Sequence, residues 1–131
     1  MNKGSKNFDA WNKAKKQTES AGRPIISKGQ IYWCKLGINI GVEIDGKNDN
    51  FKRPVLILKK FSDEIILAVP LTTKKHDGDW YYNFTFNDIE QWAILNQVKV
   101  LDTKRLIENM GELSESKVEI ILNEYITLIK K

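Results

Sequence analysis

The chain has 131 residues, of which 41% are hydrophobic and 29% charged, and its net charge is +4. This composition excludes a disordered chain and a membrane protein, and the length excludes a multidomain enzyme. Residues 1–28 carry seven basic and two acidic side chains, whereas the rest carries 14 basic and 15 acidic ones. We therefore predict a single domain over 1–131, with a basic helical arm (1–28) and a nearly neutral body (29–131).

The chain contains one cysteine, Cys34, and one histidine, His76. A single cysteine cannot form an internal disulfide, and the apolar run around it predicts a buried packing role. The histidine lies in a charged stretch and is predicted to be a solvated loop residue. A zinc site and a cysteine–histidine dyad are disfavoured, so we expect no metal and no cofactor. No apolar run is long enough for a membrane span or a signal peptide, which favours a cytoplasmic protein.

The arm carries the first predicted helix, over residues 8–20. Phe8 and Trp11 share one face at helical spacing, and Asn7 is a suitable N-cap. We expect these two aromatic side chains to pack the helix on the domain. The lysine-rich face of the same helix leaves a second interpretation open, in which the arm contacts nucleic acid.

Five short apolar runs follow the arm and predict β-strands. The second and third are apolar at consecutive positions, so both faces of the sheet should be covered. In the fourth run every even-numbered residue is aromatic, which predicts that these side chains share one face. The predicted strands span residues 30–36, 55–58, 64–71, 80–86 and 92–101.

The last thirty residues predict two helices. The first spans 103–109, with Asp102 as its N-cap and Gly111 just past its end. The second begins after Ser114 or Ser116, and the latter serine matches the S-x-x-E capping box. Its predicted apolar stripe is Val118, Ile121, Leu122, Tyr125 and Ile129. Together these elements predict an α+β, β-rich fold, a small barrel closed by helices.

Four segments carry short motifs in a fixed order, at residues 28–33, 51–58, 69–73 and 96–106. They resemble the patterns G-[DE]-I-[VW]-W, R-P-V-L-[IV], P-[IVL]-T-[ST] and [DE]-Q-x-[RK]-x-[IVL]-D-x-x-R-L, with Gln30, Tyr32 and Asn96 as the departures. The stretch 111–113 supplies a closing G-x-[IL]. Over about residues 27–129, the chain thus resembles the MazF/PemK toxins of type II toxin–antitoxin systems.

The resemblance implies an SH3-like barrel of about five to seven strands, with an N-terminal amphipathic helix, a C-terminal helix and a homodimeric assembly. It implies a toxin that cleaves single-stranded RNA at a short sequence without a metal. In that reaction the 2′-hydroxyl attacks the adjacent phosphate and leaves a cyclic phosphate and a free 5′-hydroxyl. It also implies an acidic antitoxin partner that blocks the RNA groove and binds DNA together with the toxin.

Three residues are the catalytic candidates. Arg53 stands at the motif arginine, whose forked donors match phosphate oxygens; the alternative is a structural salt bridge. Thr72 stands at the motif threonine and would hydrogen-bond a phosphate oxygen or the attacking hydroxyl; the alternative is a local backbone cap. Glu43 would act as a general base or fix Arg53; the alternative is a solvated loop carboxylate.

A further group of residues is predicted to bind the substrate. Gln97 is expected to brace the catalytic loop by hydrogen bonds, and Tyr81 to stack on a base. The full set is Thr73, Lys52, Lys74, Lys75, Gln97 and Tyr81. Asn96 and Val42 depart from the acid and the histidine that family members carry there, so the mechanism rests on the three catalytic candidates.

Two other functions stay open at this stage. One is a toxin of the same fold that inhibits a protein target such as DNA gyrase, and the other is a non-catalytic barrel that binds nucleic acid or protein. The pair of segments Arg53-Pro54 and Leu71-Thr72-Thr73 favours the nuclease over the protein-inhibiting toxin, which has no use for such a pair at a groove rim. A large separation between Arg53 and Thr72 would favour the non-catalytic barrel. Since the domain body is nearly neutral, RNA binding has to come from a local basic groove.

Overall fold

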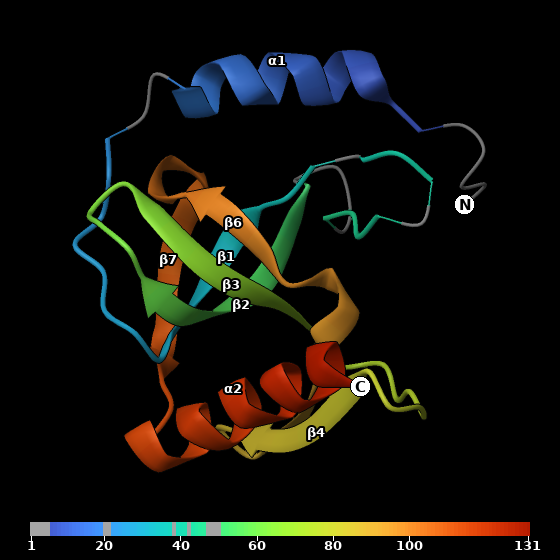
Figure 1. Cartoon of the computed structure of the whole chain (residues 1–131). Helices are drawn as coiled ribbons and strands as arrows, with labels where there is room; N and C mark the ends of the chain where they lie inside the picture. Colours follow the sequence, from blue (N-terminus) through green and yellow to red (C-terminus); the bar gives the residue numbers. More distant parts are fainter. Residues whose placement is uncertain (1–5, 20–21, 38, 42, 47–50) are drawn as a thin grey trace.

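The computed structural model describes residues 6–19, 22–37, 39–41, 43–46 and 51–131 (Figure 1). These residues form an α+β, β-rich fold, as predicted. The helices are α1 (Phe8–Glu19) and α2 (Glu115–Lys130), with two 3₁₀ turns, η2 (Leu95–Gln97) and η3 (Thr103–Arg105). The strands are β1 (Gln30–Lys35), β2 (Lys52–Lys60), β3 (Ile65–Thr72), β4 (Tyr81–Phe86), β5 (Ile89–Ile94), β6 (Lys99–Asp102) and β7 (Leu106–Glu112).

The strands build one antiparallel sheet in the order β4-β5-β3-β2-β1-β7, and β6 pairs with β3. Two strands therefore share one edge of β3: β5 pairs with Leu71 and Thr72, and β6 pairs with residues 65–68. No pairing joins β4 to β7 within the described residues. The sheet is thus open, whereas the sequence predicted a closed barrel.

Both faces of the central strands are buried, which confirms the prediction from their consecutive apolar residues. On one face Leu56 and Val69 join a core cluster to which α2 contributes Val118. On the other face Cys34 and Ile57 belong to a second cluster, covered in part by the chain that follows β1. Burying each large aliphatic side chain contributes roughly 1.5–3 kcal/mol, so these two clusters hold the domain together.

Helix α1 lies across the domain on the side away from α2 (Figure 1). Trp11 is only 5% exposed, whereas Phe8 is 51% exposed, so the prediction that both aromatic side chains pack is wrong for Phe8. Thr18 is buried on the same face as Trp11, two turns later. Asn7 caps the helix as predicted, because its Oδ1 accepts a hydrogen bond from the Ala10 amide at 3.0 Å.

The predicted fifth strand, 92–101, is wrong because η2 divides it. Leu95 turns into the first core cluster, and the chain then shifts from the Thr72 end of β3 to its Ile65 end. The polar pair Asn96 and Gln97 was the available sign of this break in an otherwise apolar run.

The predicted helix 103–109 is also wrong. Asp102 does cap a turn, accepting from the Lys104 amide at 2.8 Å, but that turn ends at Arg105. The following residues form β7 and pair with β1, so the long-range pairing overrides the local helical signal. Gly111 lies inside this strand at φ 133°, and a Cβ there would lie 2.8 Å from the Phe86 ring.

Helix α2 starts one position after Ser114, whose hydroxyl accepts from the Lys117 amide at 3.3 Å, so Ser116 is not the cap. Its stripe was predicted correctly except at the end, where Leu128 packs inward and Ile129 is exposed. Trp80 is exposed too, unlike the other aromatic residues of its predicted face. Among the described residues, no helix combines the length and the apolar character that a membrane crossing requires.

Candidate active site

Arg53 lies at the start of β2 and is only 8% exposed. Its Nε donates to the Asp45 carbonyl at 2.8 Å, and its Nη1 donates to the Leu71 carbonyl at 3.3 Å. Burial lowers the pKa of the guanidinium, and the nearby Asp45 carboxylate opposes that shift. Its described hydrogen-bond partners are thus carbonyl oxygens, and they use two of the five N–H donors of a guanidinium.

Thr72 follows directly after the Leu71 carbonyl that Arg53 contacts, so the two motif residues are brought together. Thr72 is buried, and its Oγ1 accepts a hydrogen bond from the Lys74 amide at 3.1 Å. This is the local capping contact that the sequence left open as an alternative. The same hydroxyl still has a proton, which can be donated to another oxygen.

The first loop (residues 36–51, of which 38, 42 and 47–50 lie outside the described residues) joins β1 to β2 and is tied together across its width. Asn39 donates from its side chain to the carbonyls of Leu36 at 3.0 Å and Ile44 at 2.8 Å. Its amide donates to Asp45 Oδ1 at 2.6 Å. The Gly46 amide donates to the Gly37 carbonyl at 2.7 Å. These bonds fix the stretch that presents the Asp45 carbonyl to the arginine.

Gln97 reaches the first loop from η2. Its Oε1 accepts a hydrogen bond from the Ile44 amide at 3.2 Å, directly before Asp45. Glu43 lies in the same loop but is exposed, and its Oε1 accepts from the Ile40 amide at 3.1 Å. Neither described hydrogen bond of Arg53 involves Glu43. Asn96 is exposed in η2, and Val42 lies outside the described residues.

The second loop (residues 73–80) joins β3 to β4 and presents mostly exposed side chains. Thr73, Lys74 and Lys75 are all exposed. His76, predicted to be solvated, is half-buried instead, because its ring stacks on Tyr81 with centroids 4.4 Å apart and an angle of 4° between the planes. Lys52, the remaining basic candidate, is half-buried beside Arg53 on β2.

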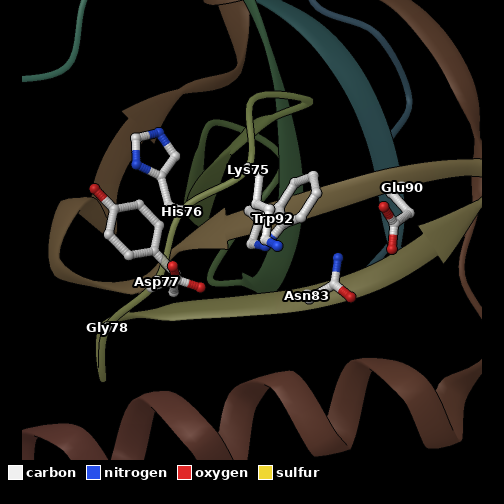
Figure 2. Close-up of a pocket in the computed structure, with 8 residues that line it drawn as sticks. Lys75, His76, Asp77, Gly78, Asn83, Glu90 and Trp92 are labelled. Carbon is white, nitrogen blue, oxygen red and sulfur yellow. The ribbon is translucent and has the colours of Figure 1, made fainter.

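A cavity of about 430 Å³ opens between the second loop and the outer face of β4 and β5 (Figure 2). In Figure 2 His76 lies on the loop side, and Asn83 and Glu90 project from the two strands. The cavity is lined by Lys75, His76, Asp77, Gly78, Tyr81, Asn83, Glu90 and Trp92. Because Trp92 is paired with Thr72 in the sheet, the cavity adjoins the Arg53–Thr72 pair.

Sequence reasoning missed three contributors to this region. Asp45 and Leu71 act through main-chain carbonyls, which leave no residue-type signature, and the Asp45-Gly46 pair indicated only a turn. Trp92 was expected in a strand, with no assignment to the site. Its position opposite Thr72 depends on the pairing of β3 with β5, which the sequence pattern did not specify.

Several solved structures have this architecture. A MazF from Deinococcus radiodurans has a TM-score of 0.65 at 15% identity, over 85% of this chain and 100% of that chain. A mycobacterial endoribonuclease in complex with its cognate antitoxin has a TM-score of 0.60 at 20% identity, over 82% of this chain and 95% of that chain. A MazE–MazF complex from D. radiodurans has a TM-score of 0.60 at 14% identity, over 83% of this chain and 97% of that chain. The fold is therefore that of the MazF-like proteins.

The sequence itself gives the more specific assignment. The family model of the PemK-like, MazF-like toxins of type II toxin–antitoxin systems matches residues 27–129. The chain therefore belongs to this family, as its four motifs predicted. A search of curated proteins gives no significant match. Helix α1 lies outside the matched residues.

Proposed function

We propose that the protein is an endoribonuclease toxin that cleaves single-stranded RNA at a short sequence without a metal ion. Support comes from its membership of the toxin family and from relatives of the same fold that are named endoribonucleases. The observation that carries the proposal is the Arg53 guanidinium, held by two carbonyls next to Thr72. A cation fixed in this way can meet a phosphate without reorganising, which is what phosphoryl-transfer catalysis requires.

In the proposed reaction the ribose 2′-oxygen attacks its own phosphate. The O2′–P bond forms, the P–O5′ bond breaks, and the products are a cyclic phosphate and a 5′-hydroxyl. Arg53 neutralises the additional charge on the phosphorane through its remaining N–H donors. Thr72 donates a hydrogen bond from its hydroxyl to a phosphate oxygen and keeps its proton. Glu43 takes the proton of the 2′-hydroxyl, and the leaving oxygen receives one from solvent.

The substrate is proposed to run from the first loop across Thr72 to the cavity beside the second loop. Lys52, Lys74 and Lys75 would contact phosphates, and Thr73 would hydrogen-bond the backbone. Tyr81 lines a cavity of about 430 Å³, which is large enough for a nucleobase. Stacking on an aromatic ring contributes roughly 1–3 kcal/mol per base, so the cavity is the proposed position of a recognised base.

We further propose that the protein is a cytoplasmic homodimer that folds as one domain and is neutralised by an acidic antitoxin. The support is the family membership and the two relatives of the same fold that are complexes with their antitoxins. In this proposal the antitoxin competes with RNA for the basic groove beside Arg53. A complex with the antitoxin would then bind DNA.

The decisive experiment is cleavage of a long single-stranded RNA by purified protein in EDTA, with mapping of the product ends. We expect cyclic phosphate ends with the wild type and no cleavage with Arg53→Ala. Lys59→Ala, an exposed cation on the same strand, is the matched control and should cleave normally. Cleavage by Arg53→Ala at the wild-type rate would contradict the mechanism. Intact RNA with wild-type protein would favour the protein-inhibiting toxin or the non-catalytic barrel.

A further inference from the structure

Helix α1 lies outside the family-matched residues 27–129 and yet contacts the loop that presents Asp45 to Arg53. In Figure 1 this helix passes over the chain that leaves β1. Just before the helix, Lys6 Nζ donates to the Asn39 carbonyl at 2.6 Å and forms an ion pair with Asp45 Oδ2 at 3.1 Å. The two side chains of this pair are 17% and 26% exposed, so solvent screens the interaction only in part.

A second contact fixes the helix at both ends of the first loop. The Trp11 ring lies 5.4 Å from the Phe51 ring, centroid to centroid. A Cβ on Gly37 would lie 2.0 Å from a Trp11 ring atom, so the indole packs directly on the backbone of that glycine. Gly37 is the second residue of the loop and Phe51 is the last, and their backbones are joined by a hydrogen bond of 3.1 Å. The indole therefore covers the two ends of the loop at Gly37 and Phe51, while Lys6 contacts its middle at Asn39 and Asp45.

Asp45 connects these contacts to the catalytic candidate. Its Oδ2 pairs with Lys6, its Oδ1 accepts from the Asn39 amide, and its carbonyl accepts from Arg53 Nε. Every polar oxygen of this residue is thus occupied by a different partner. A displacement of Asp45 would move the carbonyl that orients the guanidinium.

We propose that Lys6 is a positioning residue and that the N-terminal arm is an intramolecular clamp for Arg53. This inference rests on the proposed nuclease function for its catalytic consequence. The arm packs on both ends of the first loop, Lys6 keeps Asp45 in place, and the Asp45 carbonyl sets the direction of the guanidinium. Small displacements of a catalytic group lower the rate steeply, so the arm acts on turnover although it contacts no reacting atom.

The lysine-rich face of the arm does not account for this arrangement. Lys13, Lys15 and Lys16 are exposed, whereas Lys6 and Trp11 face the first loop. An arm that acted only by attracting RNA would depend on the exposed lysines and would change the affinity and its salt dependence. A clamp depends on Lys6 and changes turnover. The two roles are therefore separable by substitution.

The first test is the kinetics of Lys6→Met, with Lys6→Arg as the conservative rescue and Lys13→Met as the matched control. We expect Lys6→Met to lower kcat about tenfold with KM unchanged, because the guanidinium is misdirected while the RNA surface is intact. Lys6→Arg should restore most of kcat, and Lys13→Met should leave it unchanged. Equal losses in Lys6→Met and Lys13→Met, or a change in KM alone, would overturn the proposal.

The second test reads the clamp without RNA. The Nε–H of Arg53 gives its own NMR signal, and its exchange with water reports the hydrogen bond to the Asp45 carbonyl. We expect about tenfold faster exchange in Lys6→Met and also in Asp45→Asn, in which the ion pair is lost but the carbonyl remains. Exchange at the wild-type rate in both variants would overturn the clamp. A protein that cuts no RNA but shows the faster exchange would refute the nuclease function and leave the clamp supported.

Discussion

The two loops that flank the Arg53–Thr72 pair are built differently. In the first loop, hydrogen bonds link Asn39, Ile44 and Asp45 to one another, to Gln97 or to the arm. The side chain of Glu43 is exposed, but it too accepts a hydrogen bond within this loop, from the Ile40 amide. The second loop begins directly after β3, and the side chains of its first three residues, 73–75, are exposed to solvent. A braced loop suits the orientation of a catalytic group, whereas an open one suits contact with a ligand. We therefore expect changes in the first loop to alter turnover and changes in the second to alter affinity.

The largest effect should come from Arg53→Lys. A lysine keeps the charge but lacks the planar fork, so it cannot hold both carbonyls and face a phosphate at once. We expect kcat to fall by about 10²–10³-fold, the usual cost of a lost transition-state donor. Single-turnover cleavage measures the rate, and thermal unfolding verifies the fold. Near-normal turnover would mean that charge alone suffices and that the braced first loop is not needed for orientation.

The second loop is tested by Tyr81→Leu. Loss of the ring removes the stacking surface in the cavity, so KM should rise about tenfold while kcat is retained. Phe61→Leu, an exposed aromatic residue at the turn between β2 and β3, is the control. Steady-state cleavage of a short RNA distinguishes the two constants. A fall in kcat at constant KM would contradict the expectation that the second loop contributes to affinity and not to turnover.

A smaller effect is expected for Gln97→Leu, which removes the bond to the Ile44 amide. One lost hydrogen bond corresponds to about 1 kcal/mol, so we expect kcat to fall about fivefold with little change in KM. Asn96→Ala, in the same 3₁₀ turn but exposed, should behave as wild type. If the two variants have the same kcat, the brace from η2 has no role in orientation.

The double variant Lys74→Gln and Lys75→Gln should affect only binding. Each lost phosphate contact on single-stranded RNA reduces the salt slope of log affinity by about 0.7, so the slope should fall by about 1.4. The control replaces two exposed lysines elsewhere, Lys59 and Lys130, with glutamine. Titrations at several salt concentrations give the slopes. The same slope in both double variants would show that the second loop makes no special contact with phosphates.

The smallest expected effect concerns stability. Cys34 belongs to the second core cluster together with Leu36 of the first loop, and Ile44 of the same loop packs against that cluster. Burial raises the pKa of its thiol from 9.0 to about 12. Below pH 9 both the folded and the unfolded thiol are protonated, so this group adds no pH dependence. Between pH 9 and about 12 only the unfolded thiol ionises, and stability should fall by up to about 1.4 kcal/mol per pH unit. Urea unfolding of Cys34→Ala should show a correspondingly smaller decline.

The elements that the sequence predicted well are those whose signal is local. The consecutive apolar residues of β2 and β3, the Asn7 cap and the apolar stripe of α2 were recognisable because each is set by neighbouring residues. The break at η2 and the strand β7 were missed. Both depend on which distant strand the chain meets, and a strong cap at Asp102 is compatible with one turn as well as with a helix.

The candidate site divides in the same way. The motifs predicted that Arg53 and Thr72 belong to one site. In the structure Arg53 donates to the Leu71 carbonyl, directly before Thr72, so the two residues do lie close together. The Asp45 carbonyl and the contact from Lys6 were not predictable, because a main-chain acceptor has no characteristic residue type. The packing of Trp11 on Gly37 requires two segments separated by more than twenty residues to meet, which periodicity cannot reveal.

The position of Trp11 also has a consequence for the solubility of shortened forms of the protein. A chain trimmed to the family-matched residues 27–129 would leave the Phe51 ring and the backbone of Gly37 open to water. The same cut would leave the Asp45 carboxylate without its ammonium partner. A newly exposed apolar surface promotes self-association, so the trimmed protein should aggregate at concentrations at which the full chain stays in solution.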